Sequence, residues 1–332
     1  MATLMIYGAT GYTGRMISKH AKELGLNTLL AGRGEASLRE LAVDLDLPYR
    51  VFDVESLEHN TVALKDVTVL LNCAGPFYRT AKPLMTRCLR DGVHYLDITA
   101  ELDSYRIAGE LDQEAKERNV MLLPGCGGSV AMLGCLAGHV VAQLGETPSR
   151  IDIALHVAGS MSRGSAISAK ENMTTECLQR LGGLLVEQDG TALTDFDFRD
   201  GNGAVPCFPA SLPDLFTIWR STEVQNIRTF VHVSGDAFPS ADLDALPLGP
   251  TDEERDAAPY HAAVAVTARD GTIKRAVLHT VNGYTFTAAA SVEAARRVMA
   301  GEAKGLGGFQ TPAAAFGNDF VTTVQSSSIE YL

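Results

Sequence analysis

The chain lacks the motifs on which metal centres and dithiol sites are usually built. Six cysteines occur among 332 residues, but no two of them form a Cys-x-x-Cys pair, which argues against a zinc ribbon or a redox dithiol. His-Glu-x-x-His, a carboxylate–histidine cluster with metal-ligand spacing and Gly-x-Ser-x-Gly are also missing. Metal-dependent and serine-hydrolase chemistry therefore have no support, and we expect no metal site.

Positive charge and uninterrupted hydrophobic length are both scarce. Lys and Arg number 28 against 40 Asp and Glu, so the net charge is −12, and nucleic acid is not an expected partner. Residues 120–145 carry no formal charge, but Pro124-Gly125-Cys126-Gly127-Gly128-Ser129 interrupts them. A spanning helix needs about 20 continuous apolar residues, so no membrane insertion is expected. Without a basic, then apolar, leader at the start, we expect a cytoplasmic protein with reduced thiols.

Short apolar runs alternate with helical segments in the first part of the chain. These runs lie at residues 3–7, 27–31, 49–52, 67–71, 93–98 and 120–123. Short, wholly apolar strands separated by helices predict a parallel sheet that is covered on both faces. Right-handed crossovers then give an α/β fold with a doubly wound, Rossmann-type sheet.

The pattern changes after about residue 145. Residues 151–157 are predicted to form a strand and residues 165–181 a helix. Residues 262–268 and 273–281 flank Arg269-Asp270-Gly271-Thr272, which predicts a β-hairpin. Hairpins beside helices indicate a second, α+β domain with an antiparallel or mixed sheet.

A glycine-rich segment points to a dinucleotide. Gly8-Ala9-Thr10-Gly11-Tyr12-Thr13-Gly14 follows an apolar run and opens a helical segment, the context in which G-x-x-G-x-x-G is informative. The first glycine permits a tight turn, the second a close approach of the pyrophosphate, and the third close helix–strand packing. We expect the cofactor to contact Gly8, Thr10, Gly11, Tyr12, Thr13 and Gly14; the alternative is a glycine turn without a ligand.

The end of the second strand indicates which dinucleotide is bound. Arg33 follows Gly14 by 19 residues, about where an NAD-binding protein places an acid on the ribose 2′-hydroxyl. An arginine suits a 2′-phosphate instead, so NADP(H) is favoured. Asp53, after the third strand, is a candidate for the adenine amino group or, equally, an N-cap of the next helix.

Several segments together resemble a known family. The glycine motif, Ala31-Gly32-Arg33, Asn72-Cys73-Ala74-Gly75-Pro76-Phe77 and His94-Tyr95-Leu96-Asp97-Ile98-Thr99-Ala100-Glu101 occur in this order. They resemble the saccharopine dehydrogenase-like NADP-binding family, and within it most closely the branch of the trans-acting enoyl reductases of lipid biosynthesis. Where that family often has Gly-Phe-Asp-Ser-Val-Pro, this chain has Gly125-Cys126-Gly127-Gly128-Ser129-Val130, so no acid role is carried over there.

The resemblance implies an architecture and a reaction. We expect an NADP-binding Rossmann domain in residues 1–130, a substrate or dimerisation domain in residues 131–299, and residues 300–332 packing back on the first domain. Hydride would pass between NADP(H) and an activated C=C (enoyl) or C=N bond of a small molecule in the cleft between domains. The alternatives are a saccharopine- or opine-type dehydrogenase and a non-catalytic NADP-binding sensor. An antiparallel sheet in the second domain would offer a face for a homodimer.

Candidate catalytic residues follow from the rule that ligands bind beyond the carboxyl ends of parallel strands. The loop of Cys73, Ala74, Gly75 and Pro76 should lie along the nicotinamide half of the cofactor. Tyr78, Asp97 and His156 are the candidate acids, although Asp97 also suits a helix cap. Glu101 begins a helix, where its charge suits the helix dipole.

The segment from residue 160 to residue 165 is the best candidate on the substrate side. Ser162, Arg163 and Ser165 lie between a predicted strand and a predicted helix, where backbone N–H groups and a guanidinium favour an anion. The alternative is an ordinary serine N-cap. Opine substrates carry several carboxylates, yet Arg163 and Arg180 are the only arginines in residues 151–198, which disfavours that class.

Overall fold

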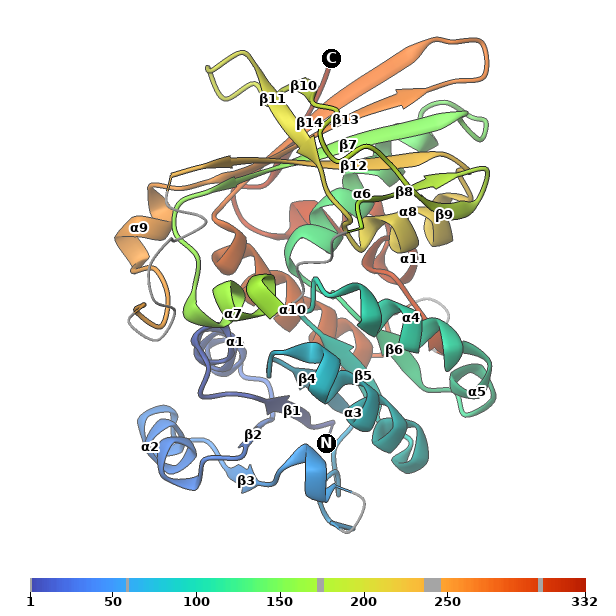
Figure 1. Ribbon diagram of the computed structural model, residues 1–332. Helices are drawn as coiled ribbons and strands as arrows, with labels where there is room; N and C mark the ends of the chain where they lie inside the picture. Colours follow the sequence, from blue (N-terminus) through green and yellow to red (C-terminus); the bar gives the residue numbers. More distant parts are fainter. Residues whose placement is uncertain (1, 58–59, 172–175, 236–245, 304–306) are drawn as a thin grey trace.

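The protein contains two sheets, one above the other in the view of Figure 1. The computed structural model describes residues 2–57, 60–171, 176–235, 246–303 and 307–332. Within these ranges, no helix combines the length and the apolarity that crossing a bilayer requires.

The first sheet is parallel and has seven strands. In sheet order they are β15 (Gly308–Phe309), β6 (Met121–Leu123), β5 (His94–Asp97), β4 (Val69–Asn72), β1 (Leu4–Tyr7), β2 (Thr28–Gly32) and β3 (Tyr49–Val51). Apart from β15, this is the 3-2-1-4-5-6 order of a Rossmann fold, and the predicted fold class is confirmed. Leu4 and Ile6 pack into one hydrophobic cluster and Met5 and Tyr7 into another, because side chains alternate between the faces of a strand.

The second sheet is mixed and has nine strands. Its main path is β10 (Thr194–Asp197), β11 (Ala204–Pro209), β12 (Ile227–Ser234), β7 (Arg150–Ala158), β13 (Tyr260–Thr267), β14 (Ile273–Thr280) and β16 (Ser328–Tyr331), and β8 (Leu178–Leu181) pairs with β12 and with β9 (Leu184–Glu187). The β13–β14 pair is antiparallel, so the predicted hairpin is confirmed. Strand β7 is parallel to β12 and antiparallel to β13.

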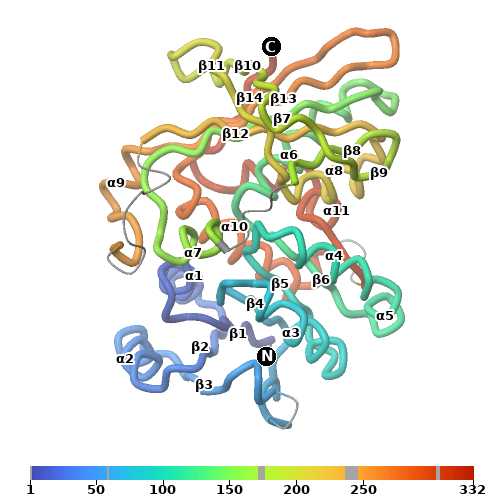
Figure 2. The backbone as a smooth tube through the Cα atoms, viewed as in Figure 1, coloured from blue at the N-terminus to red at the C-terminus, as the bar shows by residue number. Residues whose placement is uncertain are grey.

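Helices cover both sheets. They are α1 (Tyr12–Glu23), α2 (Glu35–Leu45), α3 (Phe77–Asp91), α4 (Leu102–Glu110), α5 (Asp112–Glu117), α6 (Gly128–Ala142), α7 (Arg163–Glu171), α8 (Asp214–Thr222), α9 (Asp252–Asp256), α10 (Gly283–Met299) and α11 (Pro312–Phe316), with 3-10 turns at η1 (Val54–Ser56) and η3 (Asn318–Thr323). Figure 2 shows α6 and α10 in the middle of the molecule, between the two sheets. Both helices and inner strands of both sheets share one hydrophobic cluster, so a continuous core joins the two halves.

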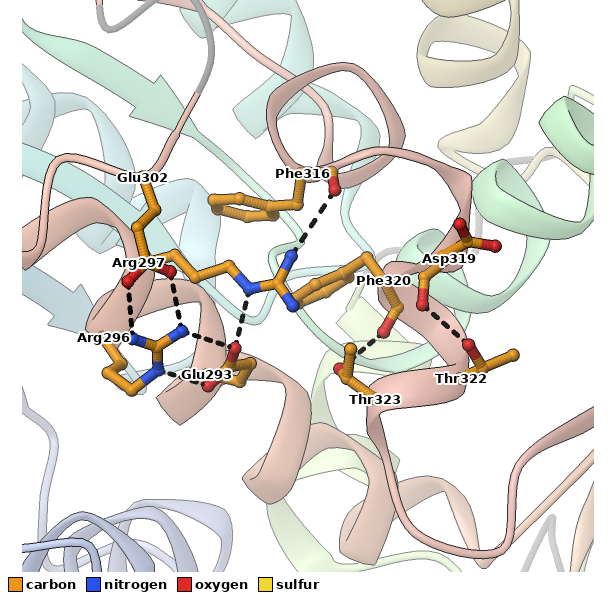
Figure 3. A network of polar contacts seen from close by, with 9 residues as sticks. All are labelled: Glu293, Arg296, Arg297, Glu302, Phe316, Asp319, Phe320, Thr322 and Thr323. Carbon is orange, nitrogen blue, oxygen red and sulfur yellow. Dashed lines mark hydrogen bonds and ion pairs between the residues drawn. The ribbon is translucent and has the colours of Figure 1, made fainter.

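The segment after α10 returns to both sheets. Strand β15 pairs in parallel with β6, whereas β16 pairs with β14 of the second sheet. Arg297 of α10 holds this segment, because its guanidinium lies between the Phe316 and Phe320 rings, at 5.8 and 5.3 Å from their centroids, as Figure 3 shows. Glu293 orients the same guanidinium by accepting from its Nε at 2.7 Å.

The helix predicted over residues 165–181 is wrong at its C-terminal end. The described part of helix α7 is Arg163–Glu171, and residues 178–181 form strand β8. In β8 the side chains of Leu178 and Arg180 are buried, while Gln179 and Leu181 are not. This alternation is typical of a strand, and pairing with β12 and β9 decides the conformation.

A row of four histidines crosses the second sheet. His232, His156, His261 and His279 are successive register neighbours on β12, β7, β13 and β14. His261 Nδ1 lies 3.0 Å from His279 Nδ1, and Asp200 lies 3.4 Å from His156. Burial, then neighbouring imidazoles, lowers the pKa of His261 to about 4. Within the described ranges, no three His, Cys, Asp or Glu side chains are grouped to hold a metal ion.

Replacing His261 by Asn should flatten the pH dependence of stability. The folded-state pKa of His261 lies below its unfolded value, so its contribution is present above about pH 6.5 and is lost as the pH falls towards 4. Between pH 7 and pH 5, the free energy of unfolding of the unaltered chain should fall by about 1–2 kcal/mol more than that of the variant. Urea titrations at both pH values measure this difference. An equal fall of the unfolding free energy in both proteins between pH 7 and pH 5 would contradict this role of His261.

Candidate functional site

The loop between β1 and α1 packs so closely that Gly8 and Gly14 leave no room for a side chain. Gly8 has φ +81°, and a Cβ there would lie 2.7 Å from the backbone nitrogen of Ala74. A Cβ on Gly14 would lie 2.3 Å from the carbonyl oxygen of Gly8. Gly11 is the N-cap residue of α1 and has no side chain that could cap the helix. Gly11 therefore leaves the N–H groups of the first turn uncovered. This is the geometry that brings a pyrophosphate to a helix N-terminus.

The residues predicted for the adenosine half lie next to each other. Arg33 follows β2, and its Nε is 4.0 Å from Asp53 Oδ2. Its side chain is 76% exposed, which leaves the guanidinium accessible to a phosphate. Asp53 caps η1 by accepting a hydrogen bond from the Glu55 N–H at 3.0 Å, so the N-cap role that the sequence left open is realised.

Tyr12 of the glycine loop contacts residues from the second half of the chain. Its hydroxyl donates to the carbonyl of Pro250 at 2.5 Å and accepts from Arg255 at 2.6 Å. Its ring meets Tyr284 edge-on, with centroids 5.2 Å apart. The sequence did not identify Arg255 or Tyr284 as site residues, because both meet Tyr12 through contacts between distant parts of the chain.

The predicted substrate loop forms a helix cap. Ser162 Oγ accepts from the Ser165 N–H at 3.2 Å at the start of α7. The hydroxyl of Tyr284 accepts from the Ser162 N–H at 2.7 Å and donates to Ser165 Oγ at 3.0 Å. Arg163 donates from Nε to the carbonyl of Leu246 at 2.8 Å. The serines therefore lie beside the tyrosine that contacts the glycine loop, while Arg163 is bound to backbone.

The loop after β4 lies against the glycine loop. Asn72 Oδ1 accepts from the Ala74 N–H at 3.0 Å, and the Cys73 N–H donates to the carbonyl of Tyr7 at 2.7 Å. The Gly75–Pro76 peptide bond is cis. Burial raises the pKa of the Cys73 thiol, so this thiol stays protonated and is a poor nucleophile.

Asp97 is buried at the carboxyl end of β5. Its Oδ1 accepts from the N–H groups of Thr99 and Gly125 at 3.0 and 2.8 Å, and its Oδ2 accepts from the Tyr95 hydroxyl at 2.8 Å. Burial is the largest influence and raises the pKa of Asp97 to about 7. The carboxyl group thus joins the loops that follow β5 and β6.

The structure places Tyr78 and His156 in different surroundings. Tyr78 lies in the first turn of α3, and its hydroxyl accepts from Arg79 Nε at 2.7 Å. The Tyr78 N–H donates to Glu101 at 2.8 Å. His156 instead bonds to Ser234 at 2.8 Å and stacks near Phe198 on the face of the second sheet that is opposite to the α6 cluster. His156 is therefore not brought together with the other candidates.

The site thus combines the edge of a Rossmann sheet with a glycine loop that provides no side-chain cap, and Pro250, Arg255 and Tyr284 contact this loop at Tyr12. Comparison with known proteins shows which proteins this chain resembles. Residues 4–123 match the family model of the saccharopine dehydrogenase NADP binding domain. A trans-acting enoyl reductase of Mycobacterium leprae (strain TN) is 27% identical over 241 residues, which cover 67% of this chain and 58% of that protein. The corresponding protein of Mycobacterium ulcerans (strain Agy99) is 25% identical, with the same coverage.

Solved structures share the fold at low identity. The saccharopine dehydrogenase (L-Glu forming) of Saccharomyces cerevisiae aligns with a TM-score of 0.67 at 12% identity and full coverage of both chains. The homospermidine synthase of Legionella pneumophila, solved in complex with NAD, aligns with a TM-score of 0.69 at 10% identity and covers 100% of this chain and 91% of that one. The predicted resemblance is confirmed, and the family model agrees with the predicted NADP(H) cofactor.

Replacing Gly14 by Ala should destabilise the protein. The new Cβ would press on the carbonyl of Gly8, a backbone atom that cannot rotate away, so the free energy of unfolding should fall by about 1–3 kcal/mol. Gly109→Ala in α4 is the control, because nothing lies within 4 Å of its added Cβ; it should gain up to about 1 kcal/mol. Urea unfolding measures both, and equal effects would contradict the packing argument.

Replacing Asp97 by Ala should cost more than replacing it by Asn. Alanine leaves three buried donors unpaired, at about 1–3 kcal/mol each, whereas the asparagine oxygen still accepts from Thr99 and Gly125. The raised pKa adds a pH effect: the folded state holds the proton more tightly, so the contribution of Asp97 falls as the pH rises through about 7. Unfolding of both variants at pH 5 and pH 8 tests this. Equal costs for Ala and Asn would exclude the acceptor role.

Proposed function

We propose that this chain is an NADP(H)-dependent oxidoreductase that transfers hydride to an activated C=C or C=N bond of a small molecule. The observation that carries the proposal is the glycine loop, which leaves the N-terminus of α1 without a side-chain cap and lies against Ala74 of the neighbouring strand loop. This is the switch point between β1 and β4, where open α/β sheets bind dinucleotides. The two mycobacterial relatives named above are enoyl reductases, which supports the same function.

In this proposal the cofactor lies across the carboxyl ends of the first sheet. The glycine loop binds the pyrophosphate, Arg33 the 2′-phosphate and Asp53 the adenine, while the loop of residues 73–76 lies along the nicotinamide. In the same proposal, residues 1–130 bind the cofactor, and residues 131–299, to which α7 and Tyr284 belong, bind the substrate. Bound NADPH supplies the hydride, and the protein excludes water and orients the acceptor.

The use of the arginines favours an enoyl over an opine-type substrate. Arg180 donates to the carbonyls of Leu215 at 2.8 Å and Gly183 at 2.6 Å and stacks 4.2 Å from the Trp219 ring centroid. Arg163 is bound to a backbone carbonyl as well. Both guanidiniums are thus bound to backbone carbonyls, so an acceptor with few charges fits better. Among the candidate acids, Tyr78 lies nearest the nicotinamide loop in sequence and is 39% exposed.

A titration of the purified protein with NADPH and NADH tests the proposal. The unaltered chain should prefer NADPH, and Arg33→Ala should weaken NADPH binding about 10–100-fold without affecting NADH, since a charge-assisted hydrogen bond is worth about 1.5–3 kcal/mol. The control is Arg39→Ala on α2, whose guanidinium pairs with Glu35 at 2.6 Å. If neither nucleotide binds, the proposal fails. Binding without turnover of enoyl and imine panels would favour a sensor.

A further inference from the structure

The N-terminus of α3 is capped from another part of the chain. The residue that precedes the helix is Pro76, which makes no side-chain cap. Glu101, which follows β5, supplies the acceptors: Oε1 receives the Phe77 N–H at 3.0 Å and Oε2 receives the Tyr78 N–H at 2.8 Å. Its side chain is buried, with 7% exposure. A buried carboxylate at a helix N-terminus is stabilised by the helix dipole and by charge-assisted hydrogen bonds.

The same carboxylate reaches into the second half of the chain. Ser168 of α7 donates from Oγ to Glu101 Oε1 at 3.0 Å. Ser168 Oγ also lies against Gly75, where an added Cβ would be 3.4 Å away. Glu101 therefore connects three elements, namely α3, the loop that carries Gly75, and α7.

Helix α7 bridges the two loops that would hold the cofactor. Near its start, Ser165 accepts from Tyr284, whose ring packs on Tyr12 of the glycine loop. One turn later, Ser168 contacts Glu101 and Gly75. Residues three apart share a helix face, so a single face of α7 meets the pyrophosphate side and the nicotinamide side of the site.

We propose that Glu101 is a positioning residue for the nicotinamide half of the cofactor, acting through the α3 N-terminus and through Ser168 of α7. The identity of the ligand in this inference rests on the proposed NADP(H) function. The contact between Glu101 and α7 does not depend on that function. Losing the Glu101–Ser168 contact loosens α7 over the loop of residues 74–76 and leaves the adenosine end of the site intact, because Arg33 and Asp53 lie on β2 and β3 connections that Glu101 does not touch.

Two variants separate these contacts. Ser168→Ala removes the Oγ hydrogen bond from α7 to Glu101 and keeps the two N–H bonds of α3. Glu101→Gln keeps the size of the side chain but presents an NH₂ group to an N–H donor, which breaks the cap. Asp103→Asn is the matched control, since Asp103 lies on the exposed surface of α4 and pairs with Arg106 at 3.0 Å.

The first measurement is amide hydrogen exchange of α7 in the protein without nucleotide. Exchange should be about fivefold to tenfold faster in Ser168→Ala and in Glu101→Gln, and unchanged in Asp103→Asn, because local opening becomes easier when a buried contact is lost. Ser168→Thr, which keeps a hydroxyl, should restore slow exchange.

The second measurement compares two ligands, NADPH and adenosine 2′,5′-bisphosphate, which lacks the nicotinamide half. Ser168→Ala should weaken NADPH about threefold to tenfold and leave the bisphosphate unchanged, a split that a general loss of stability would not produce. Equal weakening of both ligands, or unchanged α7 exchange in Ser168→Ala, overturns the inference. If Glu101→Gln does not fold, Ser168→Ala decides. If the unaltered chain binds neither ligand, the proposed function fails, and the exchange measurement still decides whether Glu101 docks α7.

Discussion

The site depends on one constraint, which is that buried backbone N–H groups need hydrogen-bond acceptors. Three parallel strands end close together, and the loops that follow them turn within a buried environment. Asn72, Asp97 and Glu101 provide side-chain oxygens for these loops, each at the carboxyl end of β4 or β5 or just beyond it. Because one carboxyl group bonds to two loops at once, the loops cannot move independently. The edge of the sheet is therefore a preformed surface rather than a set of separate turns.

The second half of the chain completes this surface by contact. Tyr12 is held between Pro250, Arg255 and Tyr284. Helix α7 contacts Glu101 and Gly75 directly, and it is connected to the glycine loop through Tyr284. The continuous hydrophobic core through α6 and α10 joins the two sheets. A cofactor lying between them would consequently meet groups from both halves, which is the arrangement that allows a reductase to exclude water during hydride transfer.

Several arginine side chains of the second half of the chain are bound to neighbouring groups. Arg163 and Arg180 are bound to carbonyls, and Arg255 bonds to Tyr12, Pro250 and Asp252. Asp97 and Glu101 accept hydrogen bonds from donors on several neighbouring elements. Among these groups, Arg33 is the one with a largely exposed side chain, and it lies at the adenosine end. This distribution suits selectivity for the phosphate of the cofactor and an acceptor that carries little charge.

Local patterns in the sequence determined the parallel sheet, the glycine loop and the β13–β14 hairpin, because each depends on neighbouring residues: apolar runs of strand length, glycines at fixed spacing, and turn residues between two strands. Tertiary structure alone decided the rest. The cap of α3 comes from Glu101, 24 positions along the chain, and Tyr12 meets Arg255 across 243 positions. The face that His156 takes depends on the register of β7 between β12 and β13, and the strand at residues 178–181 exists because β12 and β9 pair with it. Such contacts join residues that are far apart in the sequence, and a local pattern does not specify which distant residue a side chain will contact.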